Sequence, residues 1–182
     1  TRQPWQRAGR AARAGVPGLV IGCGLFGGYG ILGALRGRRK TGHGQYVVAS
    51  LFAAAIAFSI WDISEYLGTG RVPTPLGTAN RFRAPYQAVR AKDAFFVMGA
   101  NSNRLWQTLC EVLERADLFA DARFKTIADR LLNRAVLIEE LQKSFATRHA
   151  ADRIDILLGA GIPAVPILIY TQARAGVDAR AR

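Results

Sequence analysis

The sequence predicts an α/β chain in which a helical fragment is followed by a small α+β domain. Two long uncharged stretches fill the first third of the chain, and beyond residue 85 short apolar strands alternate with amphipathic helices. Between them, residues 68–85 are rich in turn-forming residues and contain three prolines. We therefore expect a basic tail at 1–15, helices at 16–67, a linker at 68–83, the small domain at 84–172 and a second tail at 173–182.

Composition limits the possible partners. The 182 residues are 50% hydrophobic, which is enough for a core, and 25 Lys and Arg against 13 Asp and Glu give a net charge of +12. That excess is typical either of a protein with an anionic partner, such as nucleic acid, a phosphorylated molecule or a membrane surface, or of a soluble protein with a solvated basic face. Aromatic residues are not interleaved with the arginines as in proteins that bind single-stranded nucleic acid, so we expect no nucleic-acid partner.

The termini and cysteines suggest where such a chain would work. Cys23 and Cys110 lie far apart without metal-ligand spacing, and each has apolar neighbours, so we expect buried, reduced thiols and a cytoplasmic protein. The first arginines are not followed by a signal peptide. Because the first residue is Thr1, we expect a fragment or a processed product.

The uncharged stretches allow two interpretations. Residues 16–35 and 41–61 contain 20 and 21 residues without a charge, and GRRK lies between them. A membrane hairpin of two spans is thus an alternative, with this basic loop on the inner side. However, the second stretch begins with Gly42–Gln45, and the glycines of the first suit close packing inside a larger protein. We therefore favour helices at 18–36 and 50–67 without a membrane partner.

The segment between these helices reads as a turn. Four of the five residues at 36–40 are cationic, which suits the negative end of a helix dipole. Gly42 and Gly44 give the backbone freedom for a tight turn. We expect a short strand at 45–48, and Ser50 then caps the next helix.

The second half contains regular signals for strands and helices. Residues 86–89 and 95–98 flank RAKDA and predict a β-hairpin. Asn101 or Ser102 is expected to cap a helix, and Asn133 another. A third helix is expected at 150–158, ending at the glycines 159–161, and a strand at 164–169. The inward faces of the first two helices are predicted to consist of Leu105, Leu109, Val112 and Leu113, and of Leu137, Ile138, Leu141 and Phe145.

Other motifs carry little weight. Residues 22–27 match G-x-G-x-x-G, but the acidic residue that a dinucleotide site needs about 20 positions later is missing. His43 and His149 lack partner motifs, and Ser50 is not in a nucleophile elbow. We expect no metal and no bound cofactor.

A series of motifs in fixed order is more specific. The first group spans the turn: Gly30-Ile31-Leu32, Ala34-Leu35, Arg39, Thr41-Gly42, Gly44-Gln45, Val47 and Ser50-Leu51. The second group follows it: Tyr66-Leu67, Gly70, Ala84-Pro85-Tyr86, Trp106, Leu109-Cys110, Asp121 to Phe124, Asn133-Arg134, Gly161 to Ala164 and Pro166. Over residues 15–172 this pattern closely resembles the family III CoA-transferases of the CaiB/BaiF type.

The resemblance implies a chemistry and also a defect. Such enzymes move CoA between carboxylic acids, and a related branch epimerises 2-methylacyl-CoA thioesters. In the transferases an aspartate attacks the acyl-CoA and carries the acyl group covalently. Counting back from the glycines that match Gly24 and Gly30 places Val20 at the position of this aspartate. Two further family residues, an aspartate and a histidine, are replaced by Val48 and Asn80.

The resemblance also implies partners. Acyl-CoA and a carboxylic acid would be the substrates, and the CoA thioester would be a substrate rather than a cofactor. A loop containing Asn80, Ala84, Pro85 and Tyr86 would face the active site. The helices would pack in a homodimer and against the family's N-terminal half, which carries most CoA contacts. We expect a partial, inactive CoA-transferase, or a non-catalytic domain that remains as a folding or oligomerisation unit.

Overall fold

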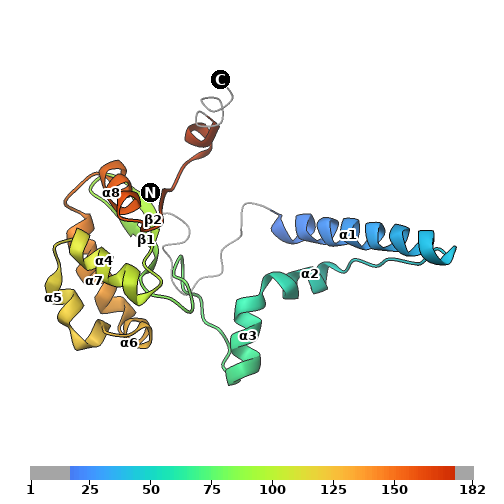
Figure 1. Cartoon of the computed structure of the whole chain (residues 1–182), viewed down its shortest axis with the longest axis horizontal. Coiled ribbons are helices and arrows are strands. Elements are labelled where there is room, and N and C mark those ends of the chain that lie inside the picture. The colour runs from blue at the N-terminus through green and yellow to red at the C-terminus, as the bar shows by residue number, and fades with distance from the viewer. Residues whose placement is uncertain (1–16, 175–182) are drawn as a thin grey trace. The chain divides into compact units, whose positions relative to one another are not determined.

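The computed structural model describes residues 17–174, and the chain divides into two compact units between Pro75 and Leu76 (Figure 1). The first unit is helical, and the second combines helices with a three-stranded antiparallel sheet. The division falls inside the predicted linker. The predicted tail at 1–15 lies outside the described residues, as does most of the tail at 173–182.

The described part of the first unit begins with the long helix α1 (Gly18–Thr41), which extends beyond the predicted end at residue 36 and ends with the predicted cations and glycine. Arg38, Arg39 and Lys40 occupy the last turn. Gly42 follows in the left-handed conformation with φ 77°, and its N–H donates to the carbonyl of Arg38 at 2.8 Å. Only a residue without a side chain adopts this conformation cheaply, so Gly42 is the residue that ends the helix. Gly44 is not left-handed.

Two expectations for the first unit are wrong. Residues 45–48 form no strand, because the described part of this unit offers no second strand to pair with. The predicted helix at 50–67 is two helices, α2 (Leu51–Phe58) and α3 (Ile60–Thr69), bent by 74°. At the break, the hydroxyl of Ser59 donates to the carbonyl of Ala55 at 2.8 Å, a bond that often bends helices.

The glycines of α1 divide into two groups. A methyl group on Gly22 would come within 1.9 Å of the Phe58 ring, and one on Gly30 within 2.6 Å of Val47. Similar groups on Gly24 or Gly28 would meet nothing within 4 Å. The chain that returns from α1 therefore packs directly on glycine positions (Figure 1). The opposite face exposes apolar side chains, and α1 is long and apolar enough to cross a membrane, whereas α2 and α3 reach that length only as one bent pair.

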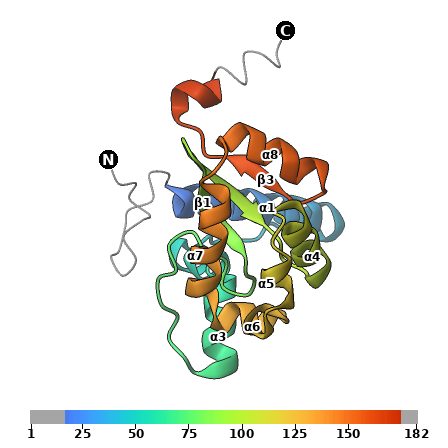
Figure 2. The same ribbon diagram turned by 90° about the vertical axis from the view of Figure 1, so that its left-hand side faces the viewer.

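The sheet of the second unit contains β1 (Tyr86–Arg90), β2 (Phe95–Gly99) and β3 (Ala164–Pro166) in the order β1-β2-β3 (Figure 2). Tyr86 pairs with Gly99 across the hairpin, and Val97 pairs with Val165. The predicted hairpin is confirmed. The third strand is shorter than the predicted 164–169.

The outer edge of β1 is bonded to segments that are not strands. The N–H of Asn80 donates to the carbonyl of Tyr86 at 2.9 Å. The N–H of Ala88 donates to the hydroxyl of Thr78 at 3.1 Å. The side-chain amide of Gln142 accepts from the N–H of Arg90 at 3.0 Å and donates to its carbonyl. The linker and one helix thus cover this edge.

Among the described residues, the second unit contains α4 (Asn103–Val112), α5 (Ala116–Ala120), the 3-10 turn η2 (Ala122–Phe124), α6 (Ile127–Leu132), α7 (Arg134–Phe145) and α8 (Ala150–Gly159), and residues 170–174 are also helical. Ser102 caps α4 by accepting the N–H of Leu105 at 3.1 Å. Asn133 precedes α7 as predicted, but its amide donates backward to Arg123 and Asp129 instead of capping. The elements α5, η2 and α6 were not predicted.

The core of the second unit lies between the sheet and the helices. Leu137, Leu141 and Phe145 follow one face of α7 and are fully buried, as predicted. Phe145 meets Phe96 of β2 edge to face at 5.4 Å. Trp106 of α4 packs in the same way on Phe124. This packing fixes the segments that carry the polar groups described next.

Candidate functional site

The loop from Asn80 to Tyr86 enters the sheet, and Asn80 shapes its first turn. The side-chain oxygen of Asn80 accepts the N–H of Phe82 at 2.9 Å, which is a typical turn of asparagine. The carbonyl of Asn80 accepts from the guanidinium of Arg134 at 2.7 Å. The peptide bond before Pro85 is cis. Ala84 and Pro85 are buried, and the carbonyl of Pro85 accepts the N–H of Ala100 at 2.9 Å.

Arg130 of α6 anchors this loop through a hydrogen bond. It is fully buried, and its Nε donates to the carbonyl of Ala84 at 3.0 Å. Its other nitrogens donate to Phe124 and to the side chain of Asn103, and the guanidinium lies over the Trp106 ring at 5.4 Å. Burial lowers the pKa of Arg130. Every nitrogen has a partner, so Arg130 is a structural clamp. Sequence reasoning missed it because its contacts are distant along the chain.

The loop also gathers positive charge. Arg134 is half-buried, and its Nε has no hydrogen-bond partner. Burial, followed by the charge of Arg81, lowers the pKa of Arg134. Arg83 belongs to the same loop and donates to the carbonyl of Phe82 at 2.9 Å. Three arginines around one turn form an arrangement that suits a carboxylate or a phosphate group.

Tyr86 borders a hollow beside this loop. The hollow has a volume of about 210 Å³ and is mostly apolar, with Met98, Asn101, Pro163 and Val165 among its lining residues. Gly99 lies opposite Tyr86, and a methyl group there would come within 3.1 Å of the Tyr86 ring. Tyr86, one of the four predicted substrate-binding residues, lines this hollow and is exposed on the surface.

Val20 lies in the first turn of α1, in the other unit. Its side chain is 60% exposed, and its neighbours Leu19 and Ile21 are also exposed. Helix α1 contains no acidic residue. Among residues 17–174, no group of three His, Cys, Asp or Glu side chains could hold a metal ion. Nothing at this position can act as a carboxylate nucleophile.

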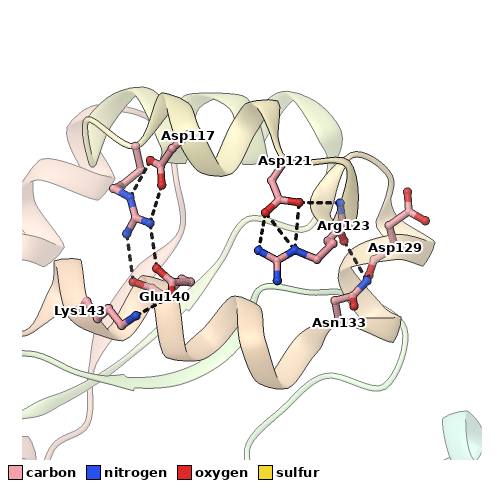
Figure 3. Close-up of polar contacts among 8 residues, drawn as sticks. Asp117, Asp121, Arg123, Asp129, Asn133, Glu140 and Lys143 are labelled. Carbon is pink, nitrogen blue, oxygen red and sulfur yellow. Dashed lines mark hydrogen bonds and ion pairs between the residues drawn. The ribbon is translucent and has the colours of Figure 1, made fainter.

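Several acidic residues of the small domain are used in ion pairs. Arg115 pairs with Asp117 at 2.7 Å and with Glu140 at 3.0 Å, and Lys143 also bonds to Glu140 (Figure 3). These hydrogen bonds lower the pKa values of Asp117 and Glu140. Asp121 forms a second pair with Arg123. The Arg115 pairs link the start of α5 to α7, whereas the pair of Asp121 and Arg123 is local to η2, and we assign these charges a structural role.

Comparisons with known proteins agree over most of the chain. The model of CoA-transferase family III matches residues 6–182. An acetyl-CoA:oxalate CoA-transferase of Acetobacter aceti is 31% identical over 166 residues, which are 91% of this chain and 43% of that protein. A succinyl-CoA:glutarate CoA-transferase of Mus musculus is 31% identical over 159 residues, which are 87% of this chain and 36% of that protein.

One protein of known structure resembles this chain in both sequence and fold. A CaiB/BaiF family protein from Brucella suis superimposes with a TM-score of 0.74 and is 29% identical, covering 100% of this chain and 47% of its own. The chain therefore spans less than half the length of these three proteins.

Proposed function

The chain belongs to CoA-transferase family III, and from this premise we propose that it provides the central helices and small domain of such an enzyme without transferring CoA by itself. One observation carries the second part. Val20 occupies the position that the family resemblance assigns to the nucleophilic aspartate, and α1 has no carboxylate. Removing a covalent nucleophile costs several orders of magnitude in rate.

The substrate class follows from the relatives. The two named above are CoA-transferases for oxalate and for glutarate, so we propose acyl-CoA and a carboxylic acid as the molecules that a complete assembly would bind. The arginines around the loop at 80–86 support this proposal because their charge suits an anionic substrate. The CoA thioester would be a substrate rather than a resident cofactor.

The proposed partner is a second copy of the chain or the remaining part of a family III enzyme. The first unit exposes many large apolar side chains along its three helices, among them Leu25, Tyr29, Leu32, Phe52, Trp61 and Leu67. An apolar surface of this extent is characteristic of an interface. We place such an assembly in the cytoplasm.

A CoA-exchange assay tests the proposed lack of activity. The chain is incubated with a panel of acyl-CoA thioesters and free acids, including oxalate and glutarate, and exchange is followed by mass spectrometry. We expect no turnover above a blank without protein. Val20→Asp alone is expected to stay inactive, because most CoA contacts are predicted in the other half. Turnover that survives Val20→Ala would show that another residue performs the chemistry.

A membrane hairpin is the second candidate, and the exposed apolar surface of α1 favours it. The two proposals differ in the solubility that they predict for the chain without detergent. A chain that stays in solution after ultracentrifugation without detergent supports an assembly of the transferase type. A chain that sediments with lipid and is released only by detergent supports the hairpin.

A further inference from the structure

A second cavity of the small domain lies apart from the loop at 80–86. It has a volume of about 420 Å³ and lies where the end of α4, the end of α7 and one face of α8 meet. Its polar lining comes from Glu114, Ser144, Thr147, Arg148 and Arg153, and its apolar lining from residues such as Ile156. Two cations therefore face one cavity beside one carboxylate.

Arg153 is the unusual member of this set. Its side chain is buried, with 7% of the residue exposed, and its Nη2 donates to the carbonyl of Ser144 and, at 2.8 Å, to the hydroxyl of Thr147. Its Nε has no partner, and it forms no ion pair within residues 17–174. A buried cation without a counter-charge is costly unless all its donors are bonded.

The surroundings make this position less favourable still. Burial, followed by the charge of Arg148, lowers the pKa of Arg153. Arg130 provides the comparison, because it is also buried without an acid, yet all three of its nitrogens donate to the protein and its face is covered by Trp106. Arg130 is satisfied by the fold. Arg153 retains unused donors beside an open cavity.

An oxyanion would satisfy these groups. A guanidinium presents paired N–H donors that match the oxygens of a carboxylate or a phosphate. The exposed Arg148 can add a second cation. We propose that the cavity between α4, α7 and α8 binds the carboxylate or phosphate group of a small molecule, with Arg153 buried beside the cavity and Arg148 at its exposed side.

The remaining lining residues limit the ligand. The volume is near the lower end of small-molecule sites. Glu114 faces the same cavity and repels anions. It follows α4 with φ 56°, in the left-handed region. The ligand is therefore small and carries its charge at one end. This site does not depend on the proposed transferase function, since neither Val20 nor the loop at 80–86 takes part.

Calorimetric titration of the whole chain tests the site. Inorganic phosphate and glutarate are the two probes, each added at constant ionic strength against chloride. We expect saturable binding of at least one anion. Stronger binding of phosphate would identify a phosphate ester as the ligand, and stronger binding of glutarate a carboxylate.

Three variants separate this site from a general effect of positive charge. Arg153→Gln is unsuitable because it removes hydrogen bonds that hold the fold. Arg148→Gln is the main variant, because the Arg148 side chain forms no hydrogen bond or ion pair in the described chain. It should weaken binding about tenfold. Arg104→Gln, the matched control at an exposed position of α4, should leave binding unchanged, and Glu114→Gln should tighten it. The proposal is overturned if neither anion saturates, or if Arg148→Gln and Arg104→Gln weaken binding equally.

Discussion

Cys110 shows what burial does to a single reactive group. It lies on the inner face of α4 with 2% of its surface exposed, and burial raises the pKa of its thiol from 9.0 to about 12. Very little of this thiol is therefore ionised at pH 8. Because the thiolate is the reactive form, we expect Cys110 to resist alkylation in the folded chain.

The Cys23→Ser variant leaves Cys110 as the single thiol and makes this expectation measurable. Thiol titration at pH 8 should detect no rapidly reacting group in the native variant and one group after unfolding in urea. The Cys110→Ser variant provides the complementary control, since it reports Cys23 alone. Rapid native labelling of Cys110 would mean that α4 opens readily.

Single residues also show which parts of the site the sequence could predict. Ser102, Ser50 and Gly42 act within a few residues of their own positions, so their types identify their roles. Arg130 donates to Ala84 across 46 positions, and no local pattern indicates that contact. The predicted substrate-binding role of Asn80 is still a prediction, although its side chain is already used in a turn.

At the scale of elements, α6 begins with a reciprocal cap that was not foreseen. The hydroxyl of Thr126 accepts the N–H of Asp129 at 3.1 Å, and the Asp129 carboxylate accepts the N–H of Thr126 at 3.0 Å. Thr126→Ala should lower the free energy of unfolding by about 1 kcal/mol. Urea denaturation measures this loss. Thr108→Ala is the control, because that hydroxyl only bonds back within α4.

The same cap has a pH dependence with a defined sign. The hydrogen bonds from Thr126 lower the pKa of Asp129 below its ordinary value of 3.8. The carboxylate therefore contributes stability above that value and loses it as the pH falls through the folded pKa. The difference between wild type and Thr126→Ala should shrink in acid. If the difference in the free energy of unfolding stays constant down to the lowest pH, the charge of Asp129 does not contribute to the cap.

The glycines of α1 make a second prediction for an element. Replacing a glycine with alanine stabilises an exposed helix by about 1 kcal/mol, so Gly24→Ala should stabilise α1. Gly22→Ala gains the same propensity but must displace the Phe58 ring. Hydrogen exchange of residues 17–69 should slow in Gly24→Ala and should not slow in Gly22→Ala. Equal slowing in both variants would show that Phe58 does not pack on α1.

Elements that need distant partners were the ones predicted wrongly. Residues 45–48 have the composition of a strand, but a strand also requires a neighbour, and the described part of the first unit has none. The apolar run after Ser50 reads as one helix because its composition does not change at Ser59. In the second unit, the inward faces of α4 and α7 were predictable because periodicity is local.

At the scale of the whole molecule, the two units differ in how much surface they bury. The second unit holds a continuous buried core, whereas one apolar residue of the first unit, Ala54, is fully buried among those described. We therefore expect the chain to associate through its first unit. Sedimentation velocity at micromolar concentration should show a dimer or larger species, and residues 76–182 alone should sediment as a monomer. A clean monomer of the full chain would contradict the proposed interface.

The bonded edge of β1 has a consequence for solubility. A free strand edge offers its N–H and C=O groups to any other extended chain, which is how sheets recruit one another into aggregates. Here Thr78 and Gln142 occupy the outward groups of Ala88 and Arg90. The Gln142→Ala variant should therefore bind thioflavin T and aggregate faster than the wild type under mild heating, although little of the core is changed. If its aggregation rate equals that of the wild type, the Gln142 side chain does not protect the edge of β1 from pairing with other chains.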